Sequence, residues 1–223
     1  MSGYLAQRET RRLRTLSRIA RVTIGIYLAV WLVQTLLAIW ALSFVATGVY
    51  GAAMFMAAQL TGLAAAIGIL AFLPSALFFL LWFHKAIANL HDAGLSGLEA
   101  RAGWSVGSFF VPLVGLWVPF GAMRELWNRS HGEDEWQAKA SVGDVGIWWL
   151  GFVAGTLVIV LIDSILVFNA LTNLEITTPR GVNEALNITG TSLWCLSAFF
   201  LFRIVGKVTR AQQTLSDDRL AFL

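Results

Sequence analysis

Four long apolar stretches constrain this chain more than any other feature of its sequence. About 20 mostly apolar residues are needed to cross the roughly 30 Å hydrocarbon core of a bilayer as a helix. The stretches are residues 22–46, 60–83, 147–169 and 185–205. Charged residues make up only 13% of the chain, against about 25% in soluble domains. The sequence therefore predicts an all-α integral membrane protein with four transmembrane helices in two hairpins, and it excludes an aqueous fold.

A fifth apolar segment, residues 103–121, is interrupted by Pro112, Pro119 and four glycines. Its relation to the membrane is indicated by Lys and Arg, which collect in short cytoplasmic loops. If the segment does not cross, fifteen of the 16 Lys and Arg residues lie on one side and only Arg180 on the other. If it crosses, the division is nine against seven. We therefore expect both termini in the cytoplasm and a segment that dips into the inner leaflet or lies along it.

The basic N-terminal run, residues 1–21, is expected to form a cytoplasmic helix. Leu5, Leu13, Leu16 and Ile19 would turn toward lipid if this helix lay on an anionic membrane surface. The alternative is that its arginines only orient the first span. Residues 22–223 are expected to form a single membrane domain, with a re-entrant or interfacial module at 103–130.

The stretch from Leu81 to Ser130 is the most distinctive part of the sequence. Its marked residues are Trp82, Asn89, Gly94, Gly103, Trp104, Phe110, Pro112, Leu116, Trp117, Pro119, Met123, Arg124, Glu125, Leu126, Trp127 and Ser130. In these residues the chain resembles the bacterial membrane family catalogued as domain of unknown function 4328. It differs in Lys85, where arginine is expected, and in Phe120, where tyrosine is usual. The resemblance implies a protein of the bacterial cytoplasmic (inner) membrane and no assigned activity.

Signatures of known chemistry are missing from the sequence. There is no P-loop, GxGxxG, HExxH or GxSxG motif and no paired Cys/His spacing, so we expect no enzyme activity, no cofactor and no metal. The formal net charge of +3 is too small to predict a nucleic-acid partner.

Six basic, amide and aromatic side chains around the broken segment are the candidate ligand-binding residues. They are Lys85, Asn89, Trp104, Arg124, Trp127 and Asn128. Each of the two basic residues has an amide residue four positions later, so each pair shares a helix face. A cationic hollow with aromatic walls suits a phosphate or an anionic lipid headgroup; the alternative is that the two cations only anchor helix ends. Glu125 and Arg129, also four apart, are expected to form an ion pair.

Polar residues inside the predicted spans form a second candidate group. Asp163 lies about six residues from the outer end of its span, or roughly 9 Å deep, where an unpaired charge is costly. Asn187 and Thr191 on the next span are expected to meet it at equal depth. Their role would be either helix packing or contact with an ion or substrate.

The function expected from these observations is binding of a small ligand or an anionic lipid headgroup at the inner leaflet. The expected partners are the bilayer, anionic lipid and other membrane-protein subunits. One alternative is an accessory or structural subunit of a larger membrane complex, for which ten tryptophans and fifteen phenylalanines offer buried surface. A second is a small transporter or channel that uses Asp163.

Overall fold

The computed structural model describes the backbone of residues 2–49, 51–172, 174 and 176–221, and the side chains between residues 11 and 214 in these ranges. Every regular element in the described ranges is a helix. Four helices are long: α1 (Ser2–Thr47), α2 (Ala52–Asp92), α5 (Gly143–Leu171) and α6 (Val182–Ala221). Each contains a stretch that is long and apolar enough to cross a membrane. The predicted all-helical fold with four membrane-competent helices is confirmed.

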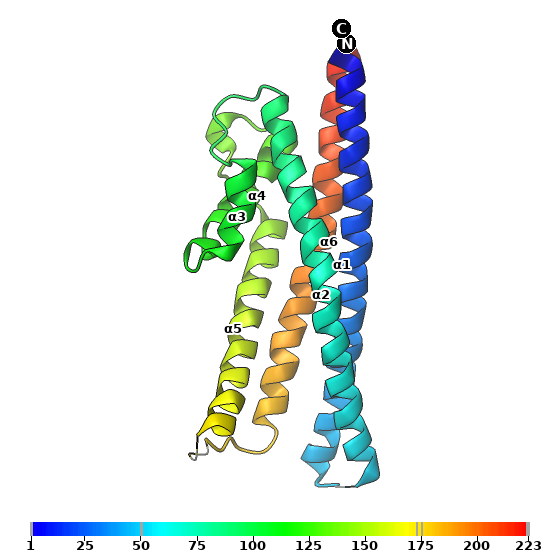
Figure 1. Ribbon diagram of the computed structural model, residues 1–223, viewed down its shortest axis with the longest axis vertical. Coiled ribbons are helices and arrows are strands. Elements are labelled where there is room, and N and C mark those ends of the chain that lie inside the picture. Colours follow the sequence, from blue (N-terminus) through cyan, green and yellow to red (C-terminus); the bar gives the residue numbers. More distant parts are fainter. Residues whose placement is uncertain (1, 50, 173, 175, 222–223) are drawn as a thin grey trace.

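The long helices run alternately up and down, so the start of α1 and the end of α6 lie together at one end of the molecule (Figure 1). α1 packs along both α2 and α6, and α5 packs along α6. The α1–α2 and α5–α6 connections lie at the opposite end (Figure 1). The segment between α2 and α5 therefore lies at the same end as the termini.

α1 continues without a break from the basic N-terminal run into the first apolar stretch. Leu13 and Ala20 are fully buried in a core that also contains residues of α2 and α6, while Leu16 and Ile19 are half-buried. The side chain of Leu5 lies outside the described residues. The prediction that this segment lies on the membrane surface with Leu13 toward lipid is wrong. Packing against neighbouring helices keeps the segment in line with the rest of α1.

α2 ends at Asp92 because Gly94 adopts a left-handed backbone conformation, with φ 70°. The N–H of Gly94 donates to the carbonyl of His91, and the N–H of Leu95 donates to the carbonyl of Leu90. This pattern satisfies the last carbonyls of a helix and turns the chain away from its axis. A loop then leads to the residues between α2 and α5.

Residues 95–142, which we call the inserted module, contain five short helices. These are α3 (Ala102–Gly107), η1 (Ser108–Phe110), η2 (Val114–Leu116), α4 (Val118–Ser130) and η3 (Glu135–Gln137). The two halves of the broken segment, before and after residues 111–113, are bent relative to each other by 116°. Pro112 lies in the break, and Pro119 occupies the first turn of α4, where its missing N–H costs no helical hydrogen bond. The predicted interruption is therefore a sharp reversal of the chain.

The inserted module rests on the long helices through a buried aromatic core. Trp82 of α2 and Met123 and Leu126 of α4 are fully buried, and Trp148 of α5 is almost fully buried. The indole Nε1 of Trp82 donates to Thr209 Oγ1 of α6 at 2.9 Å. This core fixes α4 against α2, α5 and α6.

Two glycines allow α5 and α6 to approach closely. A Cβ atom on Gly151 would lie 2.9 Å from the carbonyl oxygen of Leu193, and one on Gly155 would lie 2.9 Å from that of Gly190. Real Cβ atoms do not approach carbonyl oxygens so closely, so any side chain here would push the helices apart. Gly151 and Gly155, four residues apart, therefore form the close contact between α5 and α6 within one molecule. Small residues have the same role at other close helix contacts in membranes.

Candidate functional site

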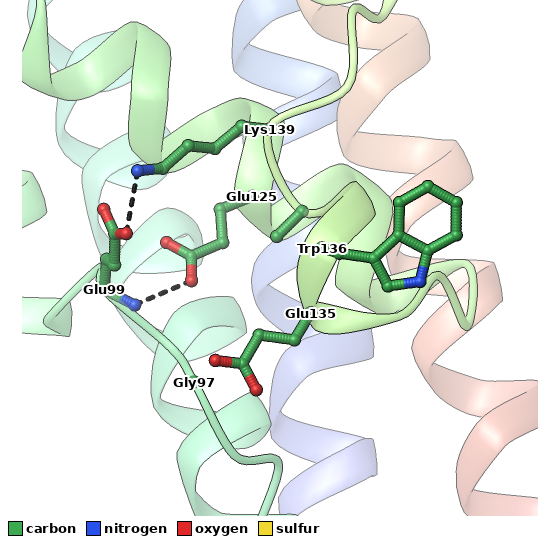
Figure 2. A pocket seen from close by; sticks show the side chains of 7 residues that line it. Gly97, Glu99, Glu125, Glu135, Trp136 and Lys139 are labelled. Carbon is green, nitrogen blue, oxygen red and sulfur yellow. Dashed lines mark hydrogen bonds and ion pairs between the residues drawn. The ribbon is translucent and has the colours of Figure 1, made fainter.

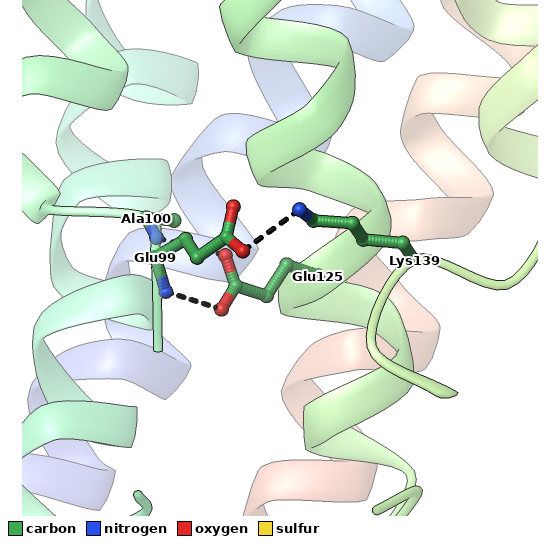
Figure 3. A network of polar contacts seen from close by, with 4 residues as sticks. All are labelled: Glu99, Ala100, Glu125 and Lys139. Atoms are coloured by element: carbon green, nitrogen blue, oxygen red, sulfur yellow. Dashed lines mark hydrogen bonds and ion pairs between the residues drawn. The ribbon is translucent and has the colours of Figure 1, made fainter. Parts of the chain in front are cut away.

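The carboxylate of Glu125 on α4 holds the loop that follows α2. Its two oxygens accept hydrogen bonds from the backbone N–H groups of Glu99 and Ala100, each at 2.8 Å (Figure 3). Glu125 is only 5% exposed, so these two donors satisfy a carboxylate that water scarcely reaches. Lys139 Nζ lies 2.7 Å from Glu99 Oε1 and ties the same loop to the chain after η3.

Two further α4 side chains hold the loops of the inserted module. Arg129 donates to the carbonyl of Ser96 at 3.0 Å and to that of Glu133 at 2.8 Å. The predicted ion pair between Glu125 and Arg129 is wrong, because both side chains reach away from each other to backbone groups. The Asn128 amide nitrogen lies 3.0–3.1 Å from the carbonyl oxygens of Gln137, Ala138 and Ala140. Asn128 is therefore a structural residue of the loop around η3.

A pocket of about 480 Å³ opens beside these loops (Figure 2). It is lined by Gly97, Glu99, Glu125, Glu135, Trp136, Ala138 and Lys139. Three carboxylates face one ammonium group, so the pocket is acidic and repels phosphate. Trp136 is 78% exposed and points away from the carboxylates (Figure 2). In the described part of the chain no three His, Cys, Asp or Glu side chains are placed to hold a metal ion.

The six predicted ligand-binding residues do not form one hollow. Asn128 binds the η3 loop, and Asn89 Nδ2 faces Gln212 Oε1 of α6 at 3.5 Å. Lys85 Nζ lies 4.0 Å from Asp92 Oδ2, and Trp104 is 53% exposed. Arg124 and Trp127, three residues apart, share one face of α4.

Arg124 and Trp127 form a cationic and aromatic face with their neighbours on α4. The Arg124 guanidinium lies 4.8 Å from the centre of the Phe120 ring. Trp127 stacks on His131 with ring centres 4.6 Å apart. Lys207 of α6 places its Nζ 5.3 Å from the centre of the Trp127 ring, within the range of a cation–π interaction.

Lys207 joins this face to the first turn of α5. Its Nζ lies 2.9 Å from Asp144 Oδ2, and Arg203 Nη2 lies 3.5 Å from the same oxygen. We call Arg124, Trp127, Asp144, Arg203 and Lys207 the cation–aromatic cluster. Three cations and one carboxylate leave it with two positive charges in excess. Such a surface attracts phosphate groups.

The cluster contains three residues that the sequence analysis did not select. In the sequence, Arg203 and Lys207 indicate the orientation of the fourth span, and no motif marks Asp144. A signal was available, because Arg203 and Lys207 are four apart on one helix face just after an apolar stretch. Their proximity to α4 depends on the packing of α4 against α6 and could not be read from spacing.

The predicted meeting of Asp163 with polar residues of α6 is wrong. Asn187 Oδ1 accepts from Gln34 Nε2 of α1 at 3.0 Å. Thr191 Oγ1 lies 2.9 Å from Thr35 Oγ1 of α1. Asp163 is exposed on α5 and has no hydrogen bond or ion pair to another described residue. Asn187 and Thr191 therefore fix α6 against α1.

Comparison with known proteins identifies the family of this chain and no activity. No curated protein and no solved structure matches the sequence. A family model described as "Domain of unknown function (DUF4328)" matches residues 45–210. This range contains the last three residues of α1, all of α2 and α5, the inserted module and the α6 cations of the cluster. The chain therefore belongs to the DUF4328 family of proteins.

Proposed function

We propose that the protein resides in a bacterial inner membrane, with four spans in two hairpins and both termini in the cytoplasm. α1 with α2, and α5 with α6, would form the hairpins. Support comes from the position of the basic residues: only Arg180 lies at the end of the molecule that carries the two hairpin connections. Because cytoplasmic segments are the ones enriched in Lys and Arg, the end with the termini and the inserted module faces the cytoplasm.

Within this orientation, the protein acts by binding the headgroup of an anionic lipid at the cation–aromatic cluster. The observation that carries the proposal is the placement of Arg203 and Lys207 on the single carboxylate of Asp144, with Lys207 also over the Trp127 ring. Arg124 adds a third cation three residues before Trp127 on α4. The side chains of Arg203 and Lys207 are 41% and 37% exposed, so they remain open to a ligand. A guanidinium can bind a phosphate through two parallel hydrogen bonds, and a tryptophan ring suits the membrane–water interface.

The surroundings of the cluster favour a lipid over a ligand dissolved in water. The Arg203 guanidinium lies 5.7 Å from the ring centre of Phe199, and Phe199 is itself 45% exposed. Leu196, one turn further into the span, is 42% exposed. An apolar stripe on α6 thus leads from the hydrocarbon region to the cations, as a bound lipid with its headgroup at the cluster requires.

Native mass spectrometry of the purified protein tests this proposal. Arg124→Gln and Lys207→Gln, made separately, should each lower the occupancy of co-purified phosphatidylglycerol several-fold. The matched control is Lys139→Gln, which removes an exposed cation at the same end of the molecule but outside the cluster. Wild-type occupancy in both cluster variants would refute lipid binding at this site.

A role as an accessory subunit is a second candidate, and exposed Asp163 favours it. A carboxyl group on the outer face of α5 would be less costly in lipid if a partner helix supplied a hydrogen-bond donor or a cation. Purification in mild detergent would then yield a stoichiometric partner that Asp163→Leu releases. A transporter that uses Asp163 gains no support, because Asn187 and Thr191 are directed toward α1.

A further inference from the structure

The reversal in the middle of the inserted module exposes apolar side chains that the protein itself does not cover. We call residues 109–117 the tip. Phe110, Leu113 and Trp117 are 73%, 76% and 74% exposed, although each is among the most costly residues to leave in water. Such a group of large apolar side chains marks a surface that contacts another apolar phase.

The backbone at the tip is strained at Leu113, the one non-glycine residue with a positive φ in the described part of the chain. Leu113 has φ 65° and ψ −50°, and the N–H of Val114 donates to the carbonyl of Pro112 at 2.8 Å. This is a γ-turn of the rare, strained kind, in a region of φ that glycine adopts freely. The exposed Leu113 side chain gains little from contacts inside the protein. A strained backbone that holds an apolar side chain at the surface is typical of a contact site.

The polar backbone groups of the tip are nevertheless largely satisfied within the molecule. The N–H groups of Val114, Gly115, Leu116 and Trp117 donate to carbonyls within the tip, and that of Val111 donates to the carbonyl of Ser108 just before it. The carbonyl of Leu116 accepts from Trp149 Nε1 at 3.0 Å. Unpaired backbone groups are costly at membrane depth, and these bonds satisfy five of the six N–H groups of residues 111–117.

The position of the tip along α5 gives its depth relative to the cation–aromatic cluster. Asp144 belongs to the cluster, and Trp149, which binds Leu116, follows it five residues later on α5. At 1.5 Å per residue the tip lies about 8 Å further along α5 toward the opposite end of the molecule. Along α4, Trp117 and Arg124 are seven residues apart, or about 10 Å. Along both helices, the tip therefore lies about 8–10 Å from the cluster, toward the opposite end of the molecule.

We propose that the tip inserts into the acyl-chain region of the leaflet whose headgroups contact the cation–aromatic cluster. The inference rests on the proposed membrane orientation and extends it: the broken segment dips into the leaflet and does not lie along its surface. Phe110, Leu113 and Trp117 contact acyl chains, while Phe109 anchors the tip to the protein. The Phe109 ring lies 5.9 Å from that of Phe79 on α2 and 6.2 Å from that of Trp149 on α5.

Spin-label accessibility in a bilayer tests the proposal. The full-length protein, with Cys195→Ala, would receive a single nitroxide at Leu113→Cys or Phe110→Cys and be reconstituted in vesicles of phosphatidylethanolamine and phosphatidylglycerol. Leu150→Cys, 69% exposed beside Trp149 on α5, is the acyl-chain reference, and Trp136→Cys, 78% exposed, is the water reference. The ratio of oxygen to nickel-complex accessibility at 110 and 113 should match that at 150 and exceed that at 136 several-fold.

The outcome separates this inference from the proposed orientation. If the accessibility ratio at 110 and 113 resembles that at 136 while site 150 is in lipid, the tip does not insert. The four proposed spans would be unaffected by that result. Site 150 in water would contradict the spans themselves. The second tip site keeps the test decisive if one of the two substitutions prevents folding.

Discussion

At the scale of single residues, three polar side chains of α4 in the distinctive part of the sequence have a structural role. Glu125, Asn128 and Arg129 each bind backbone groups of loops that are distant in sequence. A buried backbone N–H or carbonyl without a partner is costly, so these three residues make the irregular parts of the inserted module possible.

Asn128→Leu should release the loop that contains η3. The substitution leaves the carbonyls of Gln137, Ala138 and Ala140 without their donor, and we expect a loss of about 2 kcal/mol in the free energy of unfolding. Trypsin cleavage after Lys139, followed by mass spectrometry of the native protein in detergent, should become several-fold faster. Asn183→Leu at the far end of the molecule is the control and should leave this rate unchanged. Equal rates in both variants would show that Asn128 does not hold the loop.

Spacing along the sequence predicted which residues share a helix face, and it could not predict what that face meets. Arg124 and Trp127, three residues apart, share a face because α4 is a regular helix after Pro119. Asn89 and Asn128 were assigned to the same hollow, but one faces α6 and the other faces the η3 loop. Their partners lie up to 123 residues away in sequence, and tertiary packing alone decides such pairs.

At the scale of elements, hydropathy located the four long helices but not their full lengths. The apolar windows end near the membrane boundary, whereas α1 begins at Ser2, α2 extends to Asp92 and α6 extends to Ala221. Beyond the membrane boundary, each helix is stabilised because one of its faces is buried against the bundle, and it no longer needs a continuous apolar sequence. Leu13 of α1 and Val208 of α6, both fully buried, belong to this extension. A basic helix on the membrane surface and a basic helix in a bundle have similar patterns, so the pattern alone could not show that Leu13 is buried in the bundle and not turned toward lipid.

Gly155→Ala should separate α5 from α6. The added Cβ would lie 2.9 Å from the carbonyl oxygen of Gly190 and 2.8 Å from Trp194 Cδ1, so we expect a loss of about 1–3 kcal/mol from overpacking. Gly62→Ala in α2 is the matched control, because nothing lies within 4 Å of its added methyl group. That variant should gain up to about 1 kcal/mol from helix propensity. Thermal unfolding in detergent measures both, and a gain in Gly155→Ala would contradict the close helix contact.

At the scale of the whole molecule, the distribution of basic residues and the arrangement of the helices are asymmetric along the same axis. The start of α1, the end of α6 and the inserted module lie at one end, and the four apolar helices extend from it (Figure 1). Arg180 is the one Lys or Arg in the two hairpin connections at the other end. The sequence predicted this asymmetry because the distribution of Lys and Arg depends only on the order of spans and loops. It could not predict that the broken segment reverses by 116°, because that angle is set by contacts of Phe109 and Leu116 with α2 and α5.

The proposed membrane orientation requires that the inserted module and the termini share one side of the membrane. Single cysteines at Gly132 and Trp136 in the module, and at Gly48 and Leu174 in the hairpin connections, would be introduced into a Cys195→Ala background. A membrane-impermeant maleimide added to intact spheroplasts measures which sites face outward. We predict labelling at 48 and 174, and labelling at 132 and 136 only after the membrane is permeabilised. Outward labelling at 132 and 136 in intact spheroplasts would contradict the account.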